Sequence, residues 1–206
     1  MPYEELTGTK LRIFEKAAEL FAQKNYETVT MRDIGESVGI KKPSVYAHFS
    51  GKQEILDTLY DFFWEHFLVD RPKMEDVEEV IKNGSISDII DTFYYAFQGE
   101  YQTLMINITK IIENRKYVDE RAKEIASSLM MDAGIKFVED VLNRAIEMGR
   151  IAPMDTRPMG VFFAYIRFCL LQNFLLFPDK QEDLHKDEKS IVKYAEAQII
   201  DLKQAD

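Results

Sequence analysis

Residues 30–52 hold the side chains of this sequence with the most evident capacity for chemistry. Threonine, arginine, lysine, tyrosine and histidine follow one another at short intervals there, and all these types contact phosphates or base edges in nucleic-acid complexes. Two expected helix starts flank the stretch, TMRD at Thr30 and SGKQ at Ser50. Each has the form of a capping box, in which the first residue and the third helical residue bond each other's amides. Because helix N-termini bind phosphate oxygens, this arrangement predicts contacts with a phosphate backbone.

A short helix is predicted between these two starts, over residues 42–49. Pro43 suits its first turn, where no intrahelical donor is needed. Val45 and Phe49 are four residues apart and therefore share an inward face. Gly39 ends the preceding helix in the left-handed conformation that glycine adopts without strain. Two helices joined by a tight turn, the second polar on one face, describe a helix-turn-helix whose second helix fits the DNA major groove.

The segment from Lys10 to about Leu59 resembles the DNA-binding domain of tetracycline-repressor (TetR) type regulators. The motifs that carry the resemblance are AAELF, NYETVTMRDI and GIKKPSVYAHFSGK, which follow the family's pattern at its spacing. Beyond Phe67 only the helical layout and the length are similar. The resemblance implies a homodimeric regulator that binds double-stranded DNA at a palindromic operator. It also implies a repressor that a small-molecule effector releases.

Contacts with the DNA backbone are implied by the resemblance for four residues. Thr30 matches the phosphate contact at the start of the second helix, and Lys52 matches the phosphate-binding lysine of the fourth. Tyr46 and His48 match further backbone contacts. Each has a structural alternative, since Tyr46 is equally a candidate core aromatic and His48 a candidate structural histidine.

Contacts with bases are implied mainly for the start of the recognition helix. Lys42, Pro43 and Ser44 match its base-facing residues, and Arg32 matches a position that often reaches a base. Lys41 stands where members of the family often have a serine that caps this helix. Because a lysine side chain has no acceptor, we expect a weaker cap, and Lys41 becomes a candidate phosphate contact.

Composition limits the class of protein. A hydrophobic content of 46% over 206 residues is enough for a core in one or two domains. The net charge of −10 argues against nucleic acid, but residues 1–52 carry eight Lys/Arg against seven Asp/Glu, so the acidic surplus lies in the remainder. The single Cys169 lies in an apolar run and is expected to be buried and inert. With no secretory signal pattern at the start, we expect a cytoplasmic protein.

The sequence predicts an all-α fold, because apolar residues recur every three to four positions and no stretch alternates with period two. We expect an N-terminal helix-turn-helix domain of three helices over residues 1–50. A larger helical domain for effector binding and dimerisation is expected over residues 51–206. The predicted helices span residues 10–25, 31–38, 42–49, 51–67, 75–82, 87–98, 101–114, 117–148, 156–177 and 187–203. Residues 178–186 are predicted to form a polar loop.

The second domain is expected to hold a mostly apolar effector. The resemblance implies a cavity among its helices, and the candidate lining residues are Phe93, Phe97, Tyr101, Ile108, Phe137 and Tyr165. No metal, cofactor or catalytic motif is expected, since HExxH, GxSxG, P-loop and GxGxxG patterns do not occur. Two alternatives stay open. A cofactor-carrying helical enzyme predicts bound cofactor without selective DNA binding, and a regulator controlled by a partner protein predicts a filled core.

Residues 160–177 form the longest apolar stretch, which Arg167, Gln172 and Asn173 interrupt. A helix covered by protein is therefore favoured over a membrane span. Because one chain is unlikely to cover a helix that is apolar nearly all round, we expect a homodimer through the last two helices. The matching stripe on the last helix is Ile191, Tyr194, Ala195, Ile199 and Leu202.

Overall fold

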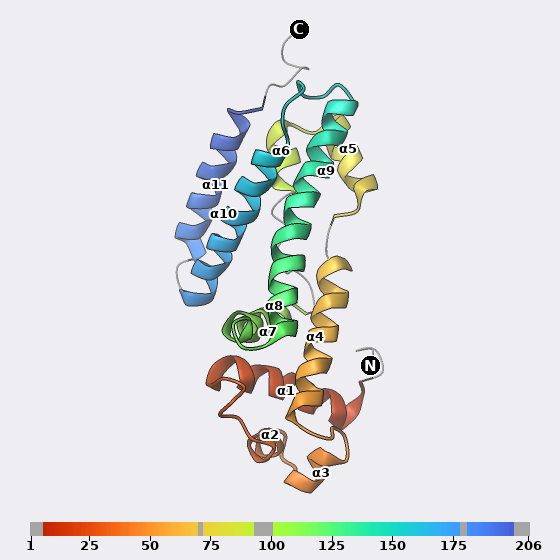
Figure 1. Cartoon of the computed structure of the whole chain (residues 1–206), viewed down its shortest axis with the longest axis vertical. Coiled ribbons are helices and arrows are strands. Elements are labelled where there is room, and N and C mark those ends of the chain that lie inside the picture. The colour runs from red at the N-terminus through yellow and green to blue at the C-terminus, as the bar shows by residue number, and fades with distance from the viewer. Residues whose placement is uncertain (1–5, 70–71, 93–100, 178–180, 200–206) are drawn as a thin grey trace. The chain divides into compact units, whose positions relative to one another are not determined.

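The computed structural model describes residues 6–69, 72–92, 101–177 and 181–199 (Figure 1). These residues form helices and no extended strand, which confirms the all-α prediction. The chain divides into two compact units. The first comprises Met1–Asp70 and Phe97–Ala126, and the second Arg71–Ala96 and Ser127–Asp206. The first unit thus adds several later helices to the residues for which a helix-turn-helix domain was predicted.

The first unit contains α1 (Gly8–Lys24), α2 (Met31–Val38), α3 (Lys42–Tyr46), α4 (Lys52–Val69), α7 (Gln102–Arg115) and α8 (Glu120–Glu124). Its core is aromatic and aliphatic. In α1, the buried side chains are those of Ile13, Phe14, Ala17, Ala18 and Phe21. The Phe14 ring meets Phe62 of α4 edge-on at 5.9 Å between centroids. α1 also packs against α2 and α7, so it is the central helix of this unit.

α2 begins and ends as its sequence predicts. The Thr30 hydroxyl oxygen accepts a hydrogen bond from the Asp33 amide at 3.2 Å, and the Asp33 carboxylate accepts one from the Thr30 amide at 2.8 Å. Both halves of the capping box are therefore present. Gly39 ends the helix with φ at 76°, the left-handed conformation that favours glycine.

The start of α4 differs from the prediction. The Gln53 side chain does not close a capping box, because it accepts from the Tyr26 hydroxyl at 3.0 Å and donates to Asp57 at 3.1 Å. The Glu54 carboxylate instead accepts the Ser50 amide at 2.6 Å. This bond lowers the pKa of Glu54 below its usual value, since it favours the charged form.

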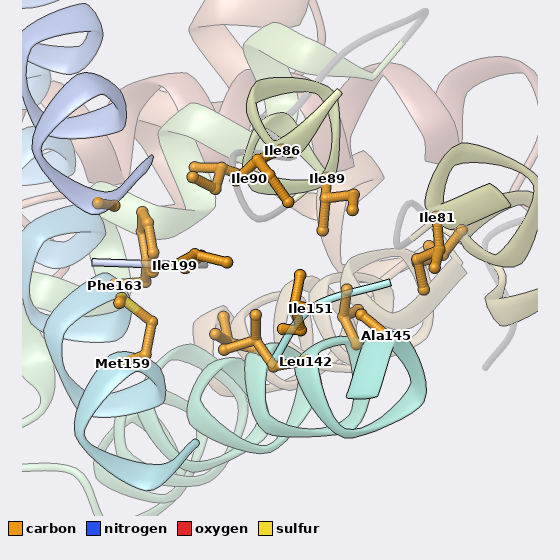
Figure 2. Close-up of a cluster of buried hydrophobic side chains, with 14 of the residues drawn as sticks. Ile81, Ile86, Ile89, Ile90, Leu142, Ala145, Ile151, Met159, Phe163 and Ile199 are labelled. Atoms are coloured by element: carbon orange, nitrogen blue, oxygen red, sulfur yellow. The ribbon is translucent and has the colours of Figure 1, made fainter. Parts of the chain in front are cut away.

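The second unit contains α5 (Met74–Asn83), α6 (Ile86–Asp91), α9 (Ala133–Glu147), α10 (Arg157–Leu176) and α11 (Gln181–Glu196). Buried side chains of all five helices form one cluster, together with Ile151 between α9 and α10 and Ile199 after α11 (Figure 2). Figure 2 shows Leu142 and Ala145 of α9 facing Ile86, Ile89 and Ile90 of α6 across this cluster.

The single helix predicted over residues 117–148 is three consecutive helical segments. α8 is followed by a π-helix, Ile125–Asp132, and then by α9. Gly149 follows α9 with φ at 64°, the left-handed conformation in which glycine often ends a helix. A π-helical stretch inserts extra residues into a helix, which rotates the residues that follow it and so changes the face they present.

Two predictions for the C-terminal region are wrong. α11 already begins at Gln181, inside the expected polar loop, and Cys169 is exposed rather than buried. Of the predicted helix over residues 87–98, the part from residue 93 lies outside the described residues.

α10 is long and apolar enough to cross a membrane by length and composition, but core helices of soluble proteins can have the same length and composition. Only 22% of its apolar window is buried within the described part of this single chain.

Candidate nucleic-acid interface

α2, α3 and the turn between them form a helix-turn-helix (residues 30–49). The turn is held by backbone bonds, including one from the Ile40 amide to the Gly35 carbonyl at 2.9 Å. Val45 and Phe49 are almost fully buried and anchor α3 to the unit, as predicted. The opposite side of α3 is exposed. It presents Lys41, Lys42, Pro43, Ser44, Tyr46 and Ala47, with His48 half-buried at its end.

Two cations of α3 lie at the start of this exposed face. Lys41 occupies the N-cap position without a side-chain cap, as expected from its lack of an acceptor. Lys42 lies with its ammonium 5.7 Å from the centre of the Tyr46 ring. Tyr46 is 46% exposed, so it is not a core aromatic in this structure. A lysine and a tyrosine on one exposed helix face suit contacts with phosphates and base edges.

Arg32 lies on α2 with 77% of its side chain exposed. Its guanidinium donates to the Glu36 carboxylate at 2.7 Å, one helical turn away. Exposed pairs of this spacing contribute little because water screens them, so a base edge is able to displace Glu36. Thr30 is also exposed, and its hydroxyl group donates to Asp33 at 2.7 Å.

Lys52 is placed differently from the other predicted contacts. Its ammonium lies within hydrogen-bonding distance of three backbone carbonyls, those of Tyr26, Glu27 and Val29, with the last at 2.8 Å. It also lies 4.3 Å from the centre of the Tyr26 ring. This partly buried position lowers the pKa of Lys52 through desolvation. The side chain is half-buried against its own unit.

The predicted effector residues are divided among several places. Phe93 and Phe97 lie outside the described residues. In the first unit, Ile108 is buried and the Tyr101 ring packs edge-on against Phe62 at 5.4 Å. In the second unit, Phe137 belongs to the buried cluster, whereas Tyr165 is 58% exposed. The effector site as a whole therefore stays a prediction.

A groove that the sequence did not indicate opens in the first unit. It has a volume of about 320 Å³ and lies between the turn after α1 and the end of α7. Its lining is Phe21, Asn25, Tyr26, Glu27, Thr28, Ile111, Asn114 and Arg115. Among the described residues, no group of three or more His, Cys, Asp or Glu side chains is placed to hold a metal ion.

Comparison with known proteins identifies the helix-turn-helix. Residues 13–59 match the family model described as bacterial regulatory proteins of the tetR family. The regulator TtgR of Pseudomonas putida is 26% identical over 192 residues, covering 90% of this chain and 89% of its own. The repressor KstR2 of Mycobacterium tuberculosis is 24% identical over 152 residues, covering 72% of each chain.

Solved structures show the same fold. The structure of KstR2, a ketosteroid transcriptional regulator, matches with a TM-score of 0.61 at 20% identity, covering 92% of this chain and 95% of its own. A transcriptional regulator from Saccharomonospora viridis in complex with choline matches with a TM-score of 0.67 at 13% identity, covering 94% and 98%. The family match places residues 13–59 in the tetR family, and relatives that align with most of this chain are transcriptional regulators, which together support a TetR-family transcriptional regulator.

Proposed function

We propose that this protein is a homodimeric repressor that binds a palindromic operator through α3 and is released by a small-molecule effector. The observation that carries the DNA-binding part is the exposed polar face of α3, held on the buried anchors Val45 and Phe49. A rigidly anchored helix of this kind presents its first residues to base edges in the major groove. We assign DNA binding to residues 1–50 and effector binding and dimerisation to residues 51–206, in a cytoplasmic protein.

The proposed contacts follow from exposure and charge. Lys42, Pro43 and Ser44 are exposed at the start of α3 and are assigned to base edges, together with Arg32 after displacement of Glu36. Lys41, Tyr46, His48 and Thr30 are assigned to the phosphate backbone. Lys52 differs, because its ammonium already contacts three carbonyls.

Repression and the binding of a small molecule are supported by relatives. KstR2 is named a repressor, and the Saccharomonospora viridis regulator was solved with choline bound. The aromatic and aliphatic residues predicted to line the site favour an effector that is largely apolar. An effector-independent regulator is the competing proposal, and a thermal-shift screen against apolar and cationic small molecules distinguishes the two.

Selection of duplexes from random DNA by the full-length protein tests DNA binding directly. The expected product is a palindrome whose half-sites are about 34–36 Å apart, or a multiple of that distance, because the two recognition helices of a dimer enter successive major grooves. Enrichment of an asymmetric single site would contradict the dimeric mode. A pool that shows no enrichment at low salt would contradict DNA recognition itself.

A further inference from the structure

Lys52 bridges the two ends of the helix-turn-helix. Tyr26, Glu27 and Val29, whose carbonyls accept from its ammonium, lie directly before Thr30, the N-cap of α2. Lys52 itself is the first residue of α4, just after the helix-turn-helix ends. The bonds therefore join points 23 to 26 residues apart along the chain. They close the base of the loop that contains both DNA-binding helices.

The donors of Lys52 match these acceptors in number. An ammonium group has three N–H donors, and three carbonyl oxygens lie within hydrogen-bonding distance of it. A phosphate oxygen would have to replace one of these carbonyls and leave it without its bond. Because the Tyr26 and Val29 carbonyls are partly buried, loss of this donor opposes such an exchange.

Tyr26 and Arg115 complete the arrangement. The Tyr26 ring lies 4.3 Å from the Lys52 ammonium and 4.2 Å from the centre of the Arg115 guanidinium. Arg115, the last residue of α7, also forms ion pairs with Glu27 and, at 3.1 Å, with Asp119. The Arg115 side chain is 12% exposed and that of Asp119 13%, so this pair is partly desolvated and stronger than a surface pair, whereas the Glu27 side chain is 63% exposed.

We propose that Lys52, Tyr26 and Arg115 form a clamp that positions the helix-turn-helix for DNA, and that Lys52 contributes to operator affinity through this clamp rather than through contact with phosphate. A closed base lowers the number of orientations that α2 and α3 sample before binding. Such preorganisation raises affinity because less conformational entropy is lost in the complex. Through Arg115, the end of α7 contributes to the geometry of the DNA-binding helices. The proposal rests on the proposed function, since it needs an operator.

The test uses the full-length protein, the selected operator duplex and a series of salt concentrations, well below the melting temperature of each variant. Lys52→Met removes the ammonium, and Lys52→Arg keeps the charge but replaces a compact three-donor group by a planar fork. We expect both to weaken operator binding about tenfold, which corresponds to about 1.4 kcal/mol, with the salt slope of the wild type. A phosphate contact would instead be retained by arginine, and its loss in Lys52→Met would reduce the salt slope by about one unit.

Arg115→Met and Tyr26→Leu test the rest of the clamp. We expect each to weaken operator binding without a change in salt slope, and Lys52→Met with Arg115→Met to weaken it less than the product of the single effects. Non-additivity of this kind indicates that two residues act through one arrangement. Tyr26→Phe, which keeps the ring, should bind more tightly than Tyr26→Leu. Lys136→Ala, which removes a charge from an exposed lysine of α9, serves as the matched control.

The outcomes separate the two proposals. If the wild-type protein selects no operator, the proposed function fails. If it selects one and Lys52→Arg binds it as tightly as the wild type, or Lys52→Met loses one unit of salt slope, the clamp is overturned while the function stands. Additive effects of Lys52→Met and Arg115→Met would also overturn it.

Discussion

At the scale of single residues, the exposed face of α3 sets the specificity that this protein is proposed to have. Lys42 lies at the base-facing start of the helix and makes a contact with the Tyr46 ring at 5.7 Å. Arg32, on α2, is held by Glu36 at 2.7 Å. Loss of either cation removes a candidate base contact without touching the buried anchors of the domain.

We therefore expect Lys42→Ala and Arg32→Ala each to cost about 1–3 kcal/mol of binding energy on the selected operator and to relax preference at one base pair. Competition binding with singly substituted operators measures both effects. Glu36→Gln is the informative companion of Arg32→Ala, because it frees Arg32 from its pair and should not weaken binding. Uniform weakening on all duplexes would show that the mutated cation contacts phosphate instead.

The capping carboxylate of α2 gives a prediction for pH. Hydrogen bonds from Thr30 lower the pKa of Asp33 below its usual value of about 4. A carboxyl group with a lowered pKa in the folded state stabilises the fold above the pKa of the unfolded state. That contribution is lost as pH falls through the folded pKa.

We expect Asp33→Asn to be less stable than the wild type at neutral pH and to lose less stability on acidification below about pH 4. Chemical unfolding followed by circular dichroism at several pH values measures this difference. Glu15→Gln, at an exposed position of α1, is the control. Parallel stability curves for Asp33→Asn and the wild type would contradict the assigned role of the carboxylate.

At the scale of elements, the second unit depends on a close approach of α9 and α10. A Cβ atom at Gly160 would lie 2.9 Å from the Ile135 carbonyl oxygen and 3.2 Å from the Glu139 side chain. A Cβ atom at Gly134 would lie 2.7 Å from the end of the Arg167 side chain. The backbone of α9 cannot move without disturbing the core, whereas an arginine side chain adopts another rotamer.

The two glycines should therefore respond in opposite ways to the same substitution. We expect Gly160→Ala to destabilise the protein by about 1–3 kcal/mol through overpacking. Gly134→Ala should be neutral or slightly stabilising, since alanine is favoured over glycine inside helices by about 1 kcal/mol. Thermal unfolding of both variants measures this contrast, and equal effects would show that the interface adapts at both sites.

At the scale of the whole molecule, the apolar surface of the second unit is the surface that we propose for dimerisation. Tyr165 and Leu176 of α10 and Tyr194 of α11 are each more than half exposed. Two members of the stripe predicted for the last helix are used inside the chain instead, because Ala195 and Ile199 belong to the buried cluster. Leu202 lies outside the described residues.

We expect the wild type to sediment as a dimer at micromolar concentration. Tyr165→Asp should shift it toward monomer, because a buried, unpaired carboxylate strongly disfavours an apolar interface. Sedimentation equilibrium measures the change, and Lys136→Ala again serves as a control with an altered surface charge. A monomeric wild type would contradict the dimer, and an unchanged dimer in Tyr165→Asp would place the interface elsewhere.

The proposed control by an effector requires that effector binding and operator binding influence each other within the whole molecule. If a ligand lowers operator affinity by a given factor, the operator must lower ligand affinity by the same factor, because the two bindings are thermodynamically linked. For a ligand found by thermal-shift screening, we expect a factor of about 5–150, equivalent to 1–3 kcal/mol. Calorimetric titration of the ligand with and without operator measures it. Equal affinities in the two titrations would exclude this form of control.

The sequence alone determined the local features of the DNA-binding region. The capping box at Thr30, the left-handed Gly39 and the inward pair Val45 and Phe49 all form between residues at most four positions apart. Their chemistry is therefore visible in a short stretch of sequence. The helical periodicity of the remainder was visible for the same reason, and so was the lack of a side-chain cap at Lys41.

Tertiary structure decided the features that depend on distant partners. The ammonium of Lys52 lies on carbonyls more than twenty residues away, next to an arginine from α7, and neither contact leaves a signal in the local sequence. At the start of α4 the Ser50 amide donates to Glu54 and not to Gln53, whose side chain accepts a hydrogen bond from the Tyr26 hydroxyl group. Burial of Ile199 and exposure of Cys169 likewise depend on which helices pack together. Periodicity shows that a face is apolar, but only packing determines what covers it.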